Sequence, residues 1–255
     1  MSLLKRVLSS VGIGAAKVDT VLLNERFRPG DLLEGTVYIN GGDVEQQIDA
    51  IYFSVHTTYE VETDDGTTTR TATLAKHQLS DSLTVEPGQQ YELPLSFQLP
   101  WHTPLTVART QVWLQTGLDI KQAIDPGDKD IIDVVPDERI VALFDALQSL
   151  GFTLYQSDCE QAPARWRRRQ PFVQEFEFKP TQGRFRGHLD ELELICFNDQ
   201  HQVEIWLEVD RKARGLGSLL SEMMELDESL VQMTYTDADT DALRDQLEQL
   251  IADHC

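Results

Sequence analysis

The sequence predicts a mainly β protein made of two β-sandwich domains, at residues 1–135 and 136–255. Short segments rich in β-branched and aromatic residues, separated by turn residues, run from residue 17 to about residue 135. No long helical period interrupts this half. One strongly helical segment follows, and strand-rich segments resume beyond it, so we expect a domain boundary at that helix.

In the first half, turn residues bound each expected strand. The run LLEGTVYIN follows the turn residues at 29–31, and IDAIYFSVHTTYEVE follows the next turn. Asp-Asp-Gly at 64–66 predicts a hairpin turn that leads into TTTRTATLAKHQL. Pro87 and Gly88 predict another turn, after which YELPLSFQLP and VWLQTGLDI are further strands.

A helix is predicted directly after Pro136. Apolar residues recur there at helical spacing, namely Ile140, Leu143, Phe144, Leu147 and Leu150. The acidic residues Asp137 and Glu138 suit the positive N-terminal end of a helix, and Gly151 suits the position just past its end. This helix lies where the two domains are expected to meet.

Beyond that helix, strands alternate between apolar and polar residues. FVQEFEF, LDELELICF and VEIWLEVD each place their large apolar residues on one face and most of their glutamates on the other. A short helix is expected around residues 216–223, and VQMTY is a candidate last strand. A C-terminal helix is predicted from one apolar face, formed by Leu243, Leu247, Leu250 and Ile251.

The N-terminus also predicts a short amphipathic helix. Its apolar face is formed by Leu4, Val7, Leu8 and Val11. Serines and glycines interrupt the run, so it is a poor signal peptide, and no segment approaches the length of a membrane span. The helix is expected either to pack on the first domain or to attach residues 1–14 peripherally to a membrane surface.

Charge and cysteine content restrict the function classes. Lysine and arginine number 22 against 43 aspartates and glutamates, which gives a formal net charge of −21. Such a charge repels nucleic-acid phosphates and anionic lipids at long range, so no nucleic-acid partner is expected. The three cysteines form no C-x-x-C pair. An odd number of unpaired cysteines fits a reducing, cytoplasmic compartment.

One basic cluster stands out against this acidic background: Arg165, Arg167, Arg168 and Arg169 fall within five positions. Guanidinium groups fit carboxylates, so the cluster is a candidate site for docking an acidic protein surface. The alternative is structural: a loop that leads into an edge strand, where positive charge discourages pairing with other chains. The sequence leaves both interpretations open.

A second candidate is an acidic run near the C-terminus. Asp237, Asp239, Asp241, Asp245 and Glu248 occupy positions 1, 3, 5, 9 and 12 of a calcium-loop template. The sixth position is Ala242 instead of the glycine that the sharp turn needs. We therefore favour a helix start with acidic residues near its positive end, with calcium binding as the alternative and calorimetry as its test.

No pattern in the sequence predicts catalysis. The six histidines show no metal-ligand spacing, and no G-x-S-x-G, P-loop or dinucleotide motif occurs. No catalytic residue, cofactor or metal is expected, and a binding protein is favoured over an enzyme.

Several stretches together resemble one known family. They are RPGDLLEGTVYINGGDVEQQIDAIYFSVHTTYEVE, PLSFQLPWHTPLT, VWLQTGLDIKQAIDPGDKDIIDVVP, ALFDALQSLGF, RRQPFVQEFEF, RGHLDELELICF and VEIWLEVDRKARGLGS. In this order they resemble the bacterial sporulation-control protein family, whose fold is similar to that of the arrestins. The resemblance implies two arrestin-like β-sandwich domains and a cytoplasmic regulatory protein without known catalysis. It supplies no catalytic residues to carry over.

The resulting functional hypothesis is a non-enzymatic regulator or adaptor that binds other proteins. One route is the addition of a partner's extended segment to an exposed strand edge. The rivals are a membrane-associated scaffold that uses residues 1–14, tested by liposome flotation with and without them, and a calcium-responsive module.

Overall fold

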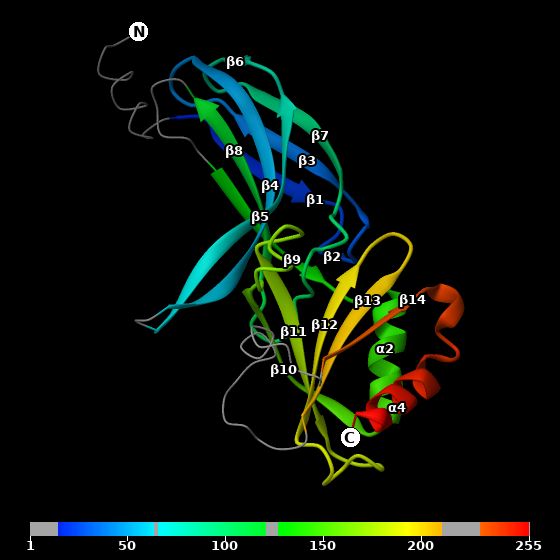
Figure 1. Ribbon diagram of the computed structural model, residues 1–255. Coiled ribbons are helices and arrows are strands. Elements are labelled where there is room, and N and C mark those ends of the chain that lie inside the picture. The colour runs from blue at the N-terminus through cyan, green and yellow to red at the C-terminus, as the bar shows by residue number, and fades with distance from the viewer. Residues whose placement is uncertain (1–14, 64–65, 121–126, 211–229, 255) are drawn as a thin grey trace. The chain divides into compact units, whose positions relative to one another are not determined.

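The computed structural model describes residues 15–63, 66–120, 127–210 and 230–254, and they form a mainly β protein (Figure 1). The chain divides into two compact units, with a junction between Val134 and Val135. Two short segments of the first half, Thr58–Ala72 and Pro104–Thr110, belong to the second unit. This division arises because the long strands β4 (Gln46–Thr63) and β5 (Gly66–Ser80) each contribute residues to both units.

The first unit contains two sheets. One is antiparallel in the order β1-β3-β7, formed by Lys17–Leu22, Leu32–Asn40 and Gln90–Gln98. In the other, β4 pairs with β5, with β6 (Leu83–Val85) and with β8 (Val112–Ile120). Strand β8 also pairs with β9 (Gly127–Val134), which holds the two-residue strand β2 (Arg26–Phe27) at its end.

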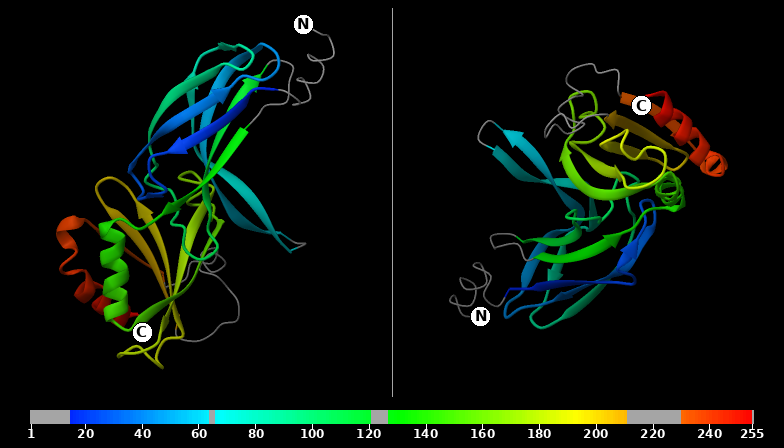
Figure 2. Two further views of the ribbon diagram at one scale, coloured as in Figure 1. Left: turned by 180° about the vertical axis from the view of Figure 1, so that it is seen from behind. Right: turned by 90° about the horizontal axis from the view of Figure 1, so that it is seen from below.

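The two sheets of the first unit lie face to face (Figure 2), and alternate apolar side chains are buried between them. Leu33 and Val37 of β3 and Phe53 of β4 are fully buried, and the ring of Phe53 contacts that of Phe97 with centroids 5.4 Å apart. The hydroxyls of Thr20 on β1 and Thr116 on β8 meet at 2.7 Å inside this core. The inward residues are therefore those that the period-2 pattern places on one face.

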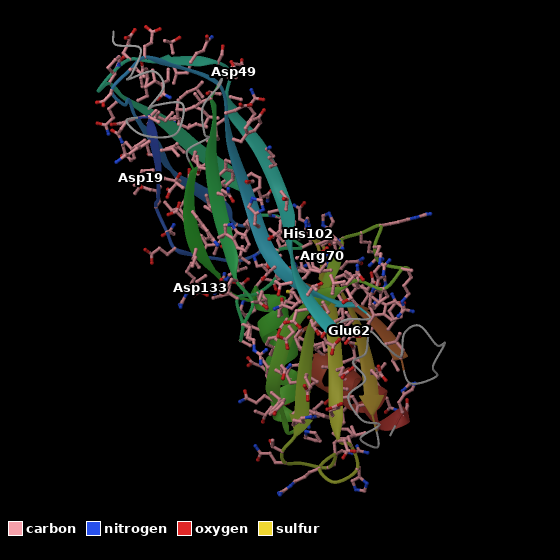
Figure 3. All side chains as sticks on the ribbon, turned by 90° about the vertical axis from the view of Figure 1, so that its left-hand side faces the viewer. Asp19, Asp49, Glu62, Arg70, His102 and Asp133 are labelled. Atoms are coloured by element: carbon pink, nitrogen blue, oxygen red, sulfur yellow. The ribbon has the colours of Figure 1, made fainter. Side chains whose placement is uncertain are left out.

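A hydrogen bond to Asp128 joins β1 to β9 in this unit. The Thr20 N–H donates to Asp128 Oδ2 at 2.7 Å, and Asp19 lies beside it on β1 (Figure 3). Burial raises the pKa of Asp130 to about 6, and the charge of Asp128, a hydrogen bond to it and the charge of Asp19 raise it further in the same direction. Ionisation of Asp130 is therefore opposed by burial and by the charges of Asp128 and Asp19.

We expect Asp130→Asn to remove a pH dependence of stability. Because the folded pKa of Asp130 is raised, the folded state binds more protons, and stability falls as the pH rises from about 3.8 to about 6. The variant should be more stable than wild type at pH 7 and should lose this slope. Chemical denaturation from pH 4 to pH 7 measures both effects. Asp119→Asn, an exposed aspartate on β8, is the control and should leave the slope unchanged.

The second unit is an antiparallel meander in the order β10-β11-β12-β13-β14. Its strands are Phe152–Gln161, Phe172–Pro180, Glu191–Asn198, Val203–Asp210 and Leu230–Tyr235. The end of β4 adds to this sheet through a parallel pairing of Glu60 with Glu160 of β10.

Two helices cover one face of this sheet (Figure 1). Helix α2 (Glu138–Ser149) sets Phe144 against Phe176 and Phe178 of β11, with ring centroids 5.2 and 5.6 Å apart. Helix α4 (Leu243–Asp253) packs on α2 and buries Leu243, Leu247 and Ile251. The predicted helix near the domain junction and the predicted C-terminal helix are therefore confirmed.

Gly151 ends α2 as the sequence predicts. Its φ of +96° is in the left-handed region, and its N–H donates to Gln148 O at 3.0 Å. A Cβ at this position would lie 2.1 Å from Gln182 O, so a larger residue would clash with backbone. The expected N-terminal helix at residues 1–14 and the short helix expected around residues 216–223 lie outside the described residues.

Candidate functional site

The four clustered arginines lie on one tight turn, which we call the arginine turn and define as residues 163–169. It joins β10 to β11. The N–H groups of Trp166 and Arg167 both donate to Pro163 O, and the Arg169 N–H donates to Trp166 O at 2.8 Å. A further bond from Ala162 N–H to Pro171 O closes its base. The backbone of the turn is therefore fixed by its own hydrogen bonds.

Trp166 anchors the turn to the sheet. Its side chain is 4% exposed and packs in a core cluster with Ala162, Val173 and Ile195. Its ring also meets Phe197 and Trp206 edge-on, with centroids 5.0 and 5.4 Å apart. The arginines thus stand on an aromatic base that is part of the folded sheet.

Arg165 is held by stacking. Its guanidinium lies 4.4 Å from the centroid of Trp166 and 4.8 Å from that of Trp206. Contact with two aromatic rings orients the group by cation–π attraction. The residue as a whole is exposed.

Arg167 and Arg169 make contacts within the unit. Arg167 Nε donates to Ala162 O at 2.9 Å, so it braces the turn on its own strand. Arg169 forms an ion pair with Glu204 of β13 at 2.9 Å and lies over Phe197. Glu204 also accepts from Trp206 Nε1 at 2.8 Å, which links the ion pair to the aromatic base.

Arg168 differs from its three neighbours. It is exposed, and among the described residues it has no hydrogen bond and no ion pair. The structure therefore places the four sequence-predicted arginines on one turn, but their side chains have two different roles. Arg167 and Arg169 hold the turn, and Arg165 and Arg168 present guanidinium groups to the outside.

The strand that follows the arginine turn is an edge strand only where it begins. Strand β11 pairs with β10 on one side and with β12 on the other. Over residues 175–178 the backbone of β11 is paired on both sides, so this part of the strand needs no edge protection. Residues 172–174, next to the arginine turn, pair with β10 alone, and protection of that short edge stays an untested alternative.

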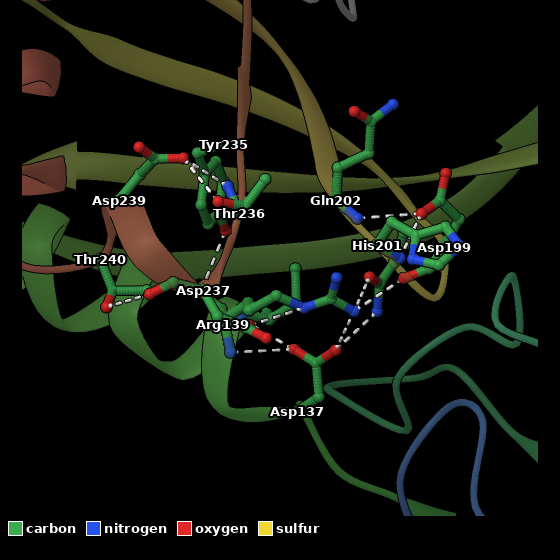
Figure 4. A network of polar contacts seen from close by, with 12 residues as sticks. Asp137, Arg139, Asp199, His201, Gln202, Tyr235, Thr236, Asp237, Asp239 and Thr240 are labelled. Atoms are coloured by element: carbon green, nitrogen blue, oxygen red, sulfur yellow. Dashed lines mark hydrogen bonds and ion pairs between the residues drawn. The ribbon is translucent and has the colours of Figure 1, made fainter.

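A buried polar network at the start of α2 was not predicted from the sequence (Figure 4). Asp137 Oδ1 caps α2 by accepting from the N–H groups of Arg139 and Ile140, and its Oδ2 accepts from Arg139 at 2.8 Å. Asn198 donates to Asp137 and accepts from Arg139. Both charged residues are buried: Asp137 is 6% exposed and Arg139 is 5% exposed.

The network fixes the ionisation of Asp137. Burial alone would raise the pKa of this carboxyl, but hydrogen bonds from Ile140 N–H, Asn198 and Arg139 and the charge of Arg139 hold it below its usual range. Tyr235 of β14 also donates to Arg139 O at 3.0 Å. The network ties α2 to strands β12 and β14, which is a structural role.

The acidic run near the C-terminus spans two short elements. Asp239 accepts from the N–H and the hydroxyl of Thr236, and so caps the 3₁₀ helix η1 (Asp237–Asp239). Asp237 lies 3.6 Å from Arg139. Glu248 of α4 forms ion pairs with Arg244 of the same helix and with Arg184. Among the described residues no group of three or more acidic, histidine or cysteine side chains is arranged to hold a metal ion. Calcium binding, the less favoured alternative for this run, stays untested.

A serine and a histidine of β4 lie in contact. Ser54 Oγ lies 3.2 Å from Gln115 O, and His56 Nε2 lies 2.8 Å from Ser54 Oγ. The other ring nitrogen, His56 Nδ1, lies 3.3 Å from Thr73 Oγ1. Burial, with the charges of Lys129 and Lys76, lowers the pKa of His56.

The thiol of Cys159 is buried. Burial raises its pKa to about 12, so it is not a reactive thiolate at neutral pH.

Neither α2 nor α4 has the length and apolar character needed to cross a bilayer, and the described residues contain no other helix that does.

Sequence reasoning found the arginines but missed their aromatic base. Phe197 and Trp206 lie on strands about 30 and 40 residues away. A usable signal was present: a tryptophan inside a basic run, followed by outward-facing aromatics in later strands. Such side chains on a nominally polar face indicate a partner within the fold.

Comparisons with known proteins agree over nearly the whole chain. A sequence profile described as SpoOM protein matches residues 4–213. The sporulation-control protein Spo0M of Bacillus subtilis strain 168 is 42% identical over 254 residues, which cover 98% of each chain. The crystal structure of Spo0M from Bacillus subtilis superposes with a TM-score of 0.89 and covers 95% of this chain and 100% of that one.

Proposed function

The chain belongs to the SpoOM protein family of sporulation-control proteins, and on that premise we propose that it is a non-enzymatic regulator that binds other proteins through the arginine turn. The occupant that we propose is an acidic segment of a partner protein. Its place of action in this proposal is the cytoplasm, which the unpaired Cys159 and Cys196 support.

The observation that carries the proposal is the orientation of Arg165 and Arg168. Both are exposed on a turn whose backbone and aromatic base are fixed by the fold. Guanidinium groups bind carboxylates through two parallel hydrogen bonds, and a side chain already held by stacking loses less conformational freedom on binding. A rigid turn with two outward arginines is therefore suited to paired carboxylates.

The negative net charge of the chain favours selective binding at the arginine turn over non-specific binding of anions. The chain carries a formal net charge of −21, so an acidic partner is repelled at a distance and attracted only where the arginines face it. Only a partner that matches the turn closely gains enough to overcome that repulsion. Binding should therefore be measured near cytoplasmic salt, where the distant charges are screened.

We expect Arg168→Glu to weaken partner capture about tenfold without changing the fold. The side chain is exposed and has no hydrogen bond, ion pair or ring contact with the described residues, so folding should not depend on it. The measurement is affinity capture from a lysate of the protein's own cell, with partners quantified by mass spectrometry. Arg186→Glu, an exposed arginine of the same unit, makes the same charge change as a control.

The two variants separate site recognition from overall charge. Partners lost with Arg168→Glu but kept with Arg186→Glu support docking on the arginine turn. Equal loss with both variants would reduce the effect to net charge, and equal capture by all three proteins would exclude the arginine turn as the site.

A further inference from the structure

The sheet face opposite α2 and α4 carries a row of glutamates. Antiparallel pairing sets Glu177 of β11 opposite Glu193 of β12, and Glu193 opposite Glu208 of β13. Glu175 lies two residues before Glu177 and therefore shares its face. Like charges placed directly opposite one another on neighbouring strands repel. A sequence pattern of this kind is expected only where the carboxyl groups are well solvated.

Three of these four glutamates are buried instead, and Glu177 is half-buried. Glu175, Glu193 and Glu208 are 8%, 8% and 7% exposed. Glu175 Oε2 is inaccessible to solvent and has no hydrogen-bond partner among the described residues. An ionised carboxylate in that position would lose its hydration without any compensating bond, which is among the most costly arrangements in a protein.

The charged groups around Glu175 come from its own strand, β11, and from β10, β12 and β13. Glu160 and Asp158 lie on β10, Asp158 directly opposite it, and Glu177 and Lys179 lie on its own strand. Glu193 and Glu208 lie on β12 and β13. Lys179 is turned to Glu177 and to Glu191, with which it forms ion pairs. Burial first, and then the charges of Glu193, Glu160, Glu208 and Glu177, raise the pKa of Glu175 well above its usual range.

We propose that Glu175 is a proton-dependent element of the second unit: it holds a proton at neutral pH, and the loss of that proton at alkaline pH weakens the β10–β13 sheet. A neutral carboxyl removes one charge from the centre of the repelling group and reduces the cost of burial. The protonated group also gains an O–H donor. The sheet therefore has one state with the proton and a less stable one without it.

The sign of the pH dependence follows from linkage. The folded state keeps the proton at pH values where the unfolded chain, with an ordinary value of 4.5, has released it. The contribution of Glu175 to stability is complete below pH 4.5 and is lost as the pH rises towards the folded value. Between these limits one bound proton changes the folding equilibrium about tenfold per pH unit.

The test compares the full-length wild type with Glu175→Gln, whose amide imitates the protonated carboxyl. Equilibrium unfolding from pH 6 to pH 9 should show wild-type stability falling, with the folding constant changing by up to about tenfold per pH unit relative to the variant. Glu177→Gln keeps the carboxyl of Glu175 but removes one of the charges that raise its pKa, so its stability should still fall with rising pH, with the fall ending at a lower pH than in the wild type. Infrared difference spectra at pH 7 should show a protonated carboxyl band that Glu175→Gln lacks.

Three results would overturn the proposal. They are the absence of that band from the wild type, identical slopes for wild type and Glu175→Gln, and failure of Glu175→Gln to fold. The last result counts because a neutral side chain of the same shape should be accepted where a neutral carboxyl is held.

Discussion

Trp166→Ala is expected to destabilise the second unit by about 3–5 kcal/mol, the range for removing a large buried aromatic side chain. The ring is 4% exposed and contacts Phe197 and Trp206 as well as the apolar core beneath the turn. Its loss leaves a cavity and also removes one of the two aromatic faces that hold Arg165. Chemical denaturation measures the stability, and partner capture measures the effect on the turn.

Trp166→Phe separates these two effects. A phenylalanine keeps much of the buried apolar area and a ring under Arg165, so we expect a smaller loss of stability and nearly normal capture. Partner capture that survives Trp166→Ala in folded protein would contradict the role of the aromatic base in orienting the arginines.

Asp137→Ala is the second change with a large expected effect, again about 3–5 kcal/mol. It removes the cap of α2 and leaves the buried guanidinium of Arg139 without its closest carboxylate. An uncompensated buried charge costs far more than the net value of the pair. The measurement is equilibrium unfolding at pH 7.

The double variant Asp137→Ser with Arg139→Met is the matched control. Serine keeps a side-chain oxygen for the helix cap, and methionine replaces the charge by an apolar chain of similar length. We expect it to recover most of the stability lost in Asp137→Ala. A double variant no more stable than Asp137→Ala would contradict the assignment of the loss to the buried charge.

Acid should weaken the same network in the wild type. The folded pKa of Asp137 is lowered, so its contribution is present above the ordinary value of 3.8 and is lost as the pH falls towards the folded value. Asp130 and Glu175 act in the opposite direction, because their folded pKa values are raised. Single variants are therefore needed to read each contribution.

Local sequence patterns were sufficient to predict both helices and most of the strands, but β10 (Phe152–Gln161) was not predicted. The spacing of Ile140, Leu143 and Leu147 located α2, and Gly151 marked its end, because helical period and left-handed glycine are properties of adjacent residues. The strands followed from alternation and turn residues for the same reason. The arrestin-like character of each domain stays an expectation of the resemblance.

Burial of the outer sheet face could not be predicted in the same way. Alternation placed Glu175 and Glu208 away from the helices correctly, but it does not say whether a second layer covers that face. The network of Asp137 and Arg139 with Asn198 joins positions about 60 residues apart. Such contacts depend on strand order and register, which a single sequence does not define.

The role of each arginine also required the structure. Four arginines in five positions are equivalent as a pattern, yet Arg169 forms an ion pair with Glu204 while Arg168 is exposed and has no ion pair among the described residues. Which side chain is tied down depends on the residues that β13 brings beneath the turn. Charge clustering therefore identified the turn, and only the fold identified the residues available to a partner.

The most direct test of docking on the arginine turn is site-specific photocrosslinking in living cells. A photoreactive amino acid is placed at position 168 in one strain and at position 186 in another. We expect the probe at 168 to crosslink a defined protein through an acidic segment, identified by mass spectrometry, and the probe at 186 to give no such product. The same crosslinks from both positions, or none from 168 while the protein still captures its partners, would show that the arginine turn is not the docking site.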